Sequence, residues 1–307
     1  MTPFVSICIP AFERPVYLKR LLDSIAQQSF KDFEVIITDD SSSDAVEELL
    51  LGSNYKFTLS YQRNQRPLGT PRNWMEGIKL ASGHWIKIMH DDDWFTDRFS
   101  LENFAAHIDE GADVLFSGYL SFDEKNSKSL NKKISQNTYQ LIRKDPYRLF
   151  ANNLIGPPSV VLFRRSMQEL YDPQLKWLVD LEAYIRMIRR YTSRYIALPL
   201  ITMSYNETQI TNACFRNPSV EVPEALYYYK KHGQSCIRSW TSYDGWWRLI
   251  RNLSIREESE LREYAGGAQV PSFLLRIIRF QRRIPPSLLR LGFVSKLLMT
   301  VSFYVNR

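Results

Sequence analysis

Three consecutive aspartates, Asp91, Asp92 and Asp93, follow directly after the apolar run Trp85–Met89. Carboxylates placed so close together repel one another, and at roughly 4 Å and an effective dielectric of about 20 each pair costs on the order of 4 kcal/mol. A divalent cation would remove this conflict. Oxygen ligands favour Mg²⁺ or Mn²⁺, which commonly bind substrate phosphate oxygens as well. The sequence therefore predicts a metal–diphosphate site, with a solvated acidic turn as the alternative.

Strand-like and helix-like segments alternate through about the first 110 residues. Strands are expected at residues 4–9, 33–38, 57–61 and 84–89, and helices at 16–28, at 46–51 and from Pro71, after a Thr70 cap, to Gly83. This alternation predicts an α/β fold with a doubly wound, mostly parallel sheet flanked by helices, in which ligands bind beyond the carboxyl ends of the strands. Polar clusters follow three of these ends, at Ala11–Glu13, at Asp39–Asp40 and at the triple aspartate. We expect the three clusters to share one rim.

After about residue 110 the regular alternation of strands and helices ends. Further strands are expected at residues 114–122 and 159–163, with a polar surface loop at 123–137 between them, and a helix is expected at 179–190. From about Pro218 the apolar residues take helical spacing. We expect a first domain at residues 1–215 and a helical, basic region at residues 216–307.

The excess of positive over negative charge comes from the end of the chain. The 307 residues contain 40 Lys and Arg against 33 Asp and Glu, and from Tyr264 onward there are seven basic residues and no acidic ones. The rest of the chain is therefore neutral. The three cysteines form no CxxC motif, which fits a reducing compartment without disulfides or a zinc site. Because the sequence shows no basic leader and no long apolar run, we expect a cytoplasmic protein without a spanning helix. The tail described below adds the expectation that the protein is peripheral on the inner face of the plasma membrane.

The order of the motifs resembles family 2 glycosyltransferases with the GT-A fold, especially bacterial enzymes of surface-polysaccharide and O-antigen assembly. The resemblance covers about residues 4–212 and rests on residues 5–12, 33–44, 81–86, 90–93, 156–159 and 179–186, with Asn64, Gly69, Arg72 and Asn73. It implies residues around the nucleotide of the donor, namely Pro10, Phe12, Glu13, Asp39, Asp40, Arg72 and Asp91. Asp39 would accept a hydrogen bond from the base, and Asp91 would contact the ribose or the sugar.

The resemblance also implies a metal site and a catalytic base. Asp92 would bind Mn²⁺ or Mg²⁺ with Asp93 beside it, but His90 stands where the commonest form of the motif has aspartate, so the register of the ligands is open by one residue. His90 itself is expected to support the ligands or to be a polar side chain at the strand end, rather than to bind the metal. Asp180 takes the position of the base that receives the acceptor's proton, and Glu182 is the alternative base. Asp180 would also suit a helix N-cap.

Two further segments depart from the family or extend it. Asn206 stands where relatives often carry a histidine that helps to hold the leaving diphosphate. In the tail, Arg276, Arg279 and Arg283 would share one helical face beside an apolar surface, and residues 288–305 are apolar at most positions. Such a tail suits an anionic membrane surface; the alternative is a helix packed on the protein with its arginines facing water.

The resemblance implies an inverting, metal-dependent transferase that moves a hexosyl group from a nucleotide-diphosphate sugar, with UDP favoured, to a hydroxyl of a lipid-linked saccharide. A catalytically silent relative that binds nucleotide sugars or scaffolds a membrane assembly is the alternative. A sugar nucleotidyltransferase would need a glycine-rich basic loop after the first strand, where this chain has Pro10–Arg14. Motifs of dinucleotide dehydrogenases and P-loop enzymes are absent, and a basic excess among Leu, Ile and Phe argues against a nucleic-acid partner.

Overall fold

The computed structural model describes residues 2–108, 111–167, 170–205 and 214–306, and these form two compact units. The first unit comprises Met1–Gln140, Ile155–Pro173 and Arg186–Glu207, and the second comprises Leu141–Leu154, Gln174–Ile185 and Thr208–Arg307. Two inner segments of the chain thus belong with the C-terminal helices. The division into functional domains at residues 1–215 and 216–307 stays a prediction.

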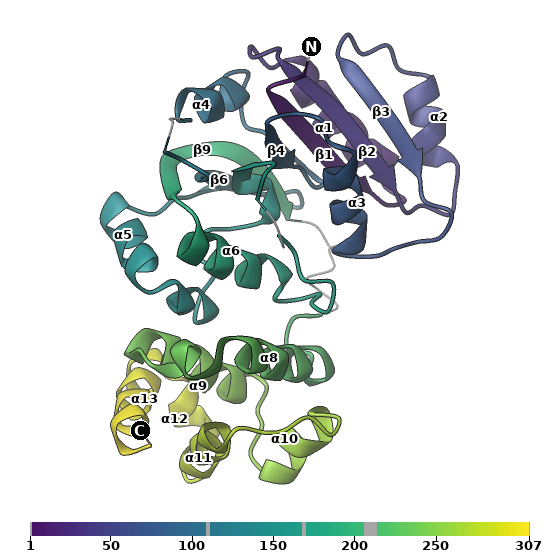
Figure 1. Ribbon diagram of the computed structural model, residues 1–307. Helices are drawn as coiled ribbons and strands as arrows, with labels where there is room; N and C mark the ends of the chain where they lie inside the picture. Colours follow the sequence, from purple (N-terminus) through teal and green to yellow (C-terminus); the bar gives the residue numbers. More distant parts are fainter. Residues whose placement is uncertain (1, 109–110, 168–169, 206–213, 307) are drawn as a thin grey trace. The chain divides into compact units, whose positions relative to one another are not determined.

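A sheet runs through the first unit (Figure 1). Its strands are β1 Val5–Ala11, β2 Phe33–Asp39, β3 Thr58–Arg63, β4 Trp85–Ile88, β5 Asp93–Phe95, β6 Val114–Asp123, β7 Lys128–Lys132, β8 Val161–Arg164 and β9 Ser193–Tyr205. The order is β3-β2-β1-β4-β8-β6-β9-β5, with β7 paired to β6. Strands β1 to β4 are parallel and so are β6 and β9, while β5, β7 and β8 run antiparallel to their neighbours. The predicted α/β fold class is confirmed.

Helices cover this sheet because its central strands are apolar on both faces. Residues of β1 and β4 are buried almost throughout, and a parallel strand of this kind needs helical cover on each side. The helices that follow the early strands are α1 Pro15–Ala26, α2 Ala45–Leu51, α3 Arg72–Leu80 and α4 Ser100–Ala106. Helix α1 buries Leu18, Leu21, Leu22 and Ile25, which recur at helical spacing. Helix α3 packs on β1 and β2.

Several sequence expectations are wrong in detail. Residues 123–137 are not one continuous loop, because residues 128–132 form β7, which pairs with β6. Every residue of β7 is exposed, so no alternation of apolar and polar residues marks it as a strand. Thr70 does not cap α3, since the helix begins at Arg72 with Pro71 as the N-cap. Asp180 is not an N-cap either, because α6 begins one residue earlier, at Val179.

The second unit is helical around an aromatic core. Its C-terminal helices are α8 Pro218–His232, α9 Trp240–Asn252, α10 Glu258–Tyr264, α11 Ser272–Gln281, α12 Pro286–Arg290 and α13 Gly292–Val305, with the 3-10 turns η1 Pro146–Phe150 and η3 Gly233–Ile237. Trp246 and Trp247 of α9 are fully buried, and the ring of Phe150 stacks on Tyr228 at 4.9 Å. None of the helices in the described part of the chain has the length and hydropathy needed to cross a bilayer.

The remaining elements are α5 Gln136–Lys144, the 3-10 turn η2 Pro158–Val160 and α6 Val179–Arg190. Of these, α5 and α6 each contain a boundary between the two units, whereas η2 belongs to the first unit. The bounds of α6 match the expected helix at residues 179–190. Its apolar positions recur at helical spacing, and most of the helix is buried.

Candidate functional site

The loops after β1, β2 and β4 meet at one edge of the sheet. These strands are parallel neighbours, with Ala11 opposite Asp39 and Cys8 opposite Ile88. The N–H of Met89 donates to the carbonyl of Cys8 at 2.9 Å, which carries the alignment into the aspartate loop. The structure therefore brings together the residues of the first unit that the sequence placed at three separate strand ends.

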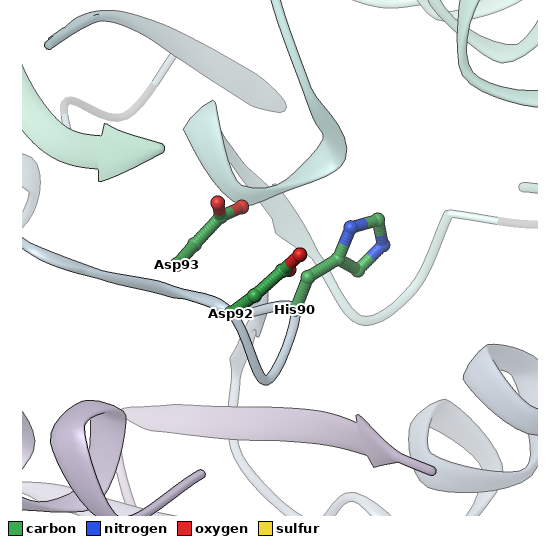
Figure 2. Close-up of side chains that lie close together, drawn as sticks. All are labelled: His90, Asp92 and Asp93. Atoms are coloured by element: carbon green, nitrogen blue, oxygen red, sulfur yellow. The ribbon is translucent and has the colours of Figure 1, made fainter. Parts of the chain in front are cut away.

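His90, Asp92 and Asp93 form a group that could hold a metal ion. One ligand atom from each lies within 4.8 Å of the others, and Figure 2 shows the three side chains close together on one loop. His90 Nε2 and Asp93 Oδ2 are buried and have no hydrogen-bond partner among the residues that the structure describes. Buried polar atoms rarely stay unpaired unless a ligand satisfies them. The two carboxylates fit Mn²⁺ or Mg²⁺, whose remaining positions water and phosphate commonly fill, whereas an imidazole ligand is typical of transition metals rather than of Mg²⁺.

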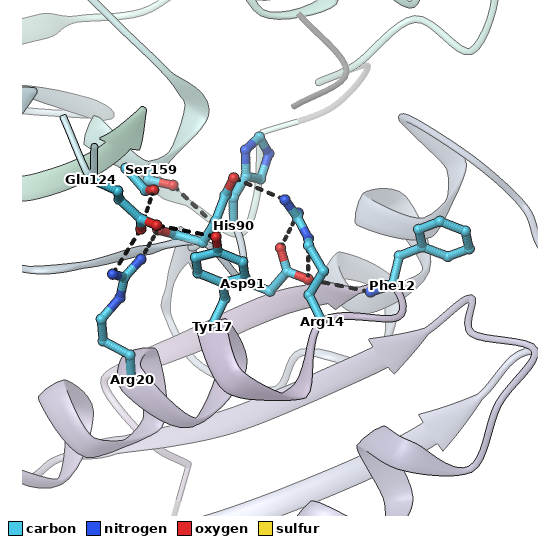
Figure 3. Close-up of polar contacts among 10 residues, drawn as sticks. Phe12, Arg14, Tyr17, Arg20, His90, Asp91, Glu124 and Ser159 are labelled. Carbon is cyan, nitrogen blue, oxygen red and sulfur yellow. Dashed lines mark hydrogen bonds and ion pairs between the residues drawn. The ribbon is translucent and has the colours of Figure 1, made fainter. Parts of the chain in front are cut away.

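Arg14 holds the first aspartate of the run and was missed by the sequence reasoning. Its Nε lies 3.3 Å from Asp91 and its Nη1 lies 3.0 Å from Asp92, while the N–H of Phe12 donates to Asp91 at 3.3 Å (Figure 3). Burial raises the pKa of Asp91 to about 7, against the opposing effect of the Arg14 charge. The crowding of carboxylates is thus relieved in part by a side chain as well as by any bound cation.

Arg20 supports the backbone of the same loop. Its Nη2 donates to the carbonyl oxygen of Asp92 at 3.1 Å, and its Nη1 pairs with Glu124 at 2.9 Å (Figure 3). Tyr17 donates its hydroxyl to Glu124 at 3.1 Å, and the Arg20 guanidinium lies 3.9 Å from the ring centre of Trp94. The three-residue spacing of Arg14, which is the N-cap of α1, with Tyr17 and Arg20 of that helix was the available signal. Nothing in the sequence pointed to Glu124.

Glu13 and Asp40 tie the loops of the site to one another. The Glu13 carboxylate accepts hydrogen bonds from the Ser42 and Ser43 N–H groups at 2.6 and 3.1 Å, and bonds to these two serines lower the pKa of Glu13 to about 2. Asp40 accepts from Asn64 Nδ2 at 2.7 Å and from the Gly69 N–H at 2.8 Å. Both carboxylates therefore hold the loops around the site in place.

The other expected nucleotide contacts differ in exposure. Asp39 is fully buried and accepts hydrogen bonds from the Ser41 N–H and the Tyr61 hydroxyl, each at 2.9 Å. Phe12 is 54% exposed, Arg72 is exposed and Pro10 is half-buried. Phe12 and Arg72 are thus open to a ligand, whereas Asp39 is held within the protein by its neighbours.

A buried lysine lies beneath the aspartate loop. Lys87 of β4 is fully buried and donates to the carbonyl oxygens of Ser159 and, at 3.3 Å, of Val161. Burial lowers its pKa well below the usual value, and the negative charge of Asp93 opposes that shift. The Ser159 hydroxyl accepts the N–H of His90 at 3.0 Å. Turn η2 therefore fixes the residue that starts the metal-binding group.

The expected catalytic bases belong to the second unit. Asp180 is half-buried and accepts hydrogen bonds from Asn153 Nδ2 at 3.1 Å and from the Leu181 N–H at 2.8 Å. Burial raises its pKa to about 6. Glu182 is fully buried and forms an ion pair with Lys231 at 2.9 Å. Asn206, the residue in place of the family's histidine, lies outside the described residues.

Comparison with known proteins supports one family. The model of glycosyl transferase family 2 matches residues 6–170. A putative glycosyltransferase of Bacillus subtilis, EpsH, is 31% identical over 272 residues, which are 86% of this chain and 72% of the relative. The GalNAc(5)-diNAcBac-PP-undecaprenol beta-1,3-glucosyltransferase of Campylobacter jejuni is 30% identical over 149 residues, 47% of each protein.

A solved structure shows the same fold. Residues 1–349 of S. aureus TarS, in complex with UDP-GlcNAc, are 15% identical and match 99% of this chain and 92% of that chain with a TM-score of 0.57. At this identity the likeness concerns the GT-A fold alone. With the family match over more than half of the sequence and a relative above 30% identity, the chain belongs to glycosyltransferase family 2.

Proposed function

We propose that this glycosyltransferase is a metal-dependent, inverting enzyme that uses a nucleotide-diphosphate sugar. The observation that carries the proposal is the group of His90, Asp92 and Asp93 at the carboxyl ends of the parallel strands. Asp92 and Asp93 would hold Mn²⁺ or Mg²⁺, with His90 as a candidate third ligand. When bound, such an ion neutralises the charge that grows on a diphosphate leaving group.

Residues of the first unit would bind the nucleotide. The exposed ring of Phe12, with Pro10 beside it, offers an apolar face to a base, and exposed Arg72 offers a charge to the diphosphate. Asp39 would exchange its bond with Tyr61 for one from the base. UDP is favoured because a carboxylate accepts the imide N–H of uracil, and the TarS structure named above contains UDP-GlcNAc.

Asp180 is a better candidate for the base than Glu182. A proton acceptor works best when its pKa lies near the operating pH, and burial has raised the pKa of Asp180 to about 6. Asn153 and the Leu181 N–H fix the orientation of its carboxylate. Glu182, in contrast, is fully buried and engaged with Lys231, so we assign it to the stability of the second unit.

The acceptor we propose is a hydroxyl of a lipid-linked saccharide in the synthesis of a cell-surface polysaccharide. The Campylobacter relative is named for an acceptor on undecaprenyl diphosphate, and a single displacement by an acceptor hydroxyl would invert the anomeric carbon. A lipid-linked acceptor also suits a protein that works at the inner surface of a membrane.

Transfer assays with defined donors test the proposal. Full-length protein with Mn²⁺ is given UDP-, dTDP- and GDP-sugars with and without undecaprenyl-linked oligosaccharide, and release of the nucleotide diphosphate is measured. We expect acceptor-dependent release from one donor and at least a hundredfold loss in Asp180→Asn, because general bases contribute about 10² to 10⁴ in rate. The exposed Glu263→Gln is the matched control. No release from any donor would indicate a silent relative, and near-normal turnover of Asp180→Asn would remove its assigned role.

A further inference from the structure

The basic tail contains two apolar helices that behave differently. In α11 the residues Phe273, Leu274, Ile277 and Ile278 are buried, so its apolar side packs inside the second unit. Arg279 of this helix pairs with Glu258 at 2.5 Å. The alternative in which a tail helix packs on the protein with its arginines outward therefore fits α11.

Helix α13 differs from α11 because it also exposes large apolar side chains. Its exposed residues include Phe293 at 84%, Leu297 at 57%, Val301 at 44% and Tyr304 at 70%. At about 100° per residue these four side chains fall within an arc of roughly 80°, so they form one continuous stripe, which we call the α13 face.

The side of α13 that points into the protein is partly polar. Ser295 and Ser302 are buried there beside Met299 and Phe303. The Ser295 hydroxyl accepts the indole N–H of Trp247 at 3.0 Å, and the Ser302 hydroxyl bonds to the Tyr243 hydroxyl at 2.8 Å. The serines of α13 thus bond inside the protein, while Phe, Leu, Val and Tyr side chains face outward. Such an exposed apolar stripe is typical of a helix whose outer side contacts an apolar environment.

The charges near α13 indicate which environment this is. Arg283 and Arg290, which precede the helix, are exposed, and no acidic residue occurs between Tyr264 and the end of the sequence. Basic groups at the edge of an apolar helix face complement the phosphates of anionic lipids. A second protein copy would bring the same positive charge to the contact and be repelled.

We propose that the α13 face inserts into the boundary between headgroups and acyl chains of an anionic bilayer, with Arg283 and Arg290 contacting lipid phosphates. The helix would lie along the surface, since it is too short to span the membrane. This inference deepens the proposed function, because the sugar of a lipid-linked acceptor lies at the same depth. Lipid binding itself needs neither donor nor turnover.

Vesicle co-sedimentation of the full chain tests the inference. Vesicles of phosphatidylcholine alone are compared with vesicles that also contain phosphatidylglycerol. Phe293→Glu/Leu297→Glu is expected to weaken binding to the anionic vesicles at least tenfold. The matched control is Leu51→Glu/Leu130→Glu, which changes two exposed leucines of the first unit and is expected to bind like the wild type. Arg283→Gln/Arg290→Gln should bind both kinds of vesicle equally weakly.

Three results would overturn the inference: absence of wild-type binding to either vesicle, equal loss in the control variant, or a dimer in sedimentation velocity that Phe293→Glu/Leu297→Glu abolishes. A water-soluble acceptor separates this inference from the proposed function. If the α13 variant keeps normal transfer to a short-chain acceptor analogue while losing vesicle binding, both stand. If transfer is absent but vesicle binding follows the expected pattern, only the proposed function fails.

Discussion

Glu224 of α8 offers a sharp test of how the second unit positions Asp180. Its buried carboxylate accepts the N–H groups of Lys176 at 2.8 Å, Trp177 at 2.9 and 3.1 Å, and Leu178 at 2.8 Å. These three amides directly precede α6, the helix that carries Asp180. One side chain therefore anchors the start of that helix, where a negative charge also interacts favourably with the positive end of the helix dipole.

Glu224→Gln keeps the shape of the side chain but removes its charge and half of its acceptor capacity. Hydrogen bonds to a charged group contribute about 1.5–3 kcal/mol each, against about 0.5–1.5 for neutral ones, and the new amide NH₂ faces a donor. We expect the free energy of unfolding to fall by about 2–3 kcal/mol, which lowers the Tm by roughly 5 °C in a chain of this size. Glu221→Gln, one turn earlier on α8, removes a carboxylate that accepts the single N–H of Arg216 and should cost less.

The same variant changes the pH dependence of transfer. Burial is the main cause of the raised pKa of Asp180, and the negative charge of Glu224 raises it further. Asp180 must be ionised to accept a proton, so wild-type kcat should rise with pH through about 6. Without the charge of Glu224 the pKa of Asp180 falls, and this rise should move to lower pH. A profile that stays in place or moves to higher pH, together with unchanged stability, would refute the assigned contacts.

Three further substitutions test other parts of the structure. Gly156→Ala should lower the free energy of unfolding, measured with denaturant, by about 2–4 kcal/mol, because Gly156 has a φ of +117° and a Cβ there would lie 2.5 Å from Tyr119 Cε1. Gly52→Ala is the control, and equal stability of the two variants would contradict the geometry. Arg14→Gln should lower kcat/KM at least tenfold, and Arg14→Lys should recover only part of the wild-type kcat/KM, since Lys cannot reproduce paired contacts to Asp91 and Asp92. Full activity of Arg14→Gln would exclude a role of Arg14 in holding these aspartates. Glu13→Gln loses charged hydrogen bonds to Ser42 and Ser43 and should raise the KM for the donor with little change in kcat. An unchanged KM would show that these bonds do not contribute to nucleotide binding.

The regular elements could be predicted where burial leaves a pattern in the sequence. Strand β2 shows a run of apolar residues, and α1 and α6 show helical spacing. Strand β5 was not foreseen because it has three residues, one of them Asp93, and pairs with Met203 far along the chain. Strand β7 was not foreseen because it is wholly exposed and polar. Strands β5 and β7 are both defined by hydrogen bonding to a neighbouring strand, which the pattern of apolar residues within one segment does not reveal.

The candidate site was predictable in its centre and not in its surroundings. Charge crowding alone pointed to the triple aspartate and to a cation. The partners of those carboxylates, Arg14 and Arg20, depend on where α1 lies after folding, and Glu124 lies 104 residues beyond Arg20. Likewise the contact of Tyr61 with Asp39 follows from the pairing of β2 with β3. Long-range packing, rather than local pattern, decides these contacts.

Calorimetric titration of UDP into the protein, in Mn²⁺ and in EDTA, most directly tests a metal-assisted nucleotide site at Asp92 and Asp93. We expect the wild type to bind UDP in Mn²⁺ and at least ten times more weakly in EDTA, and Asp92→Asn to bind weakly in both. Equal affinity of the wild type with and without the metal, or full metal-dependent affinity in Asp92→Asn, would contradict the site.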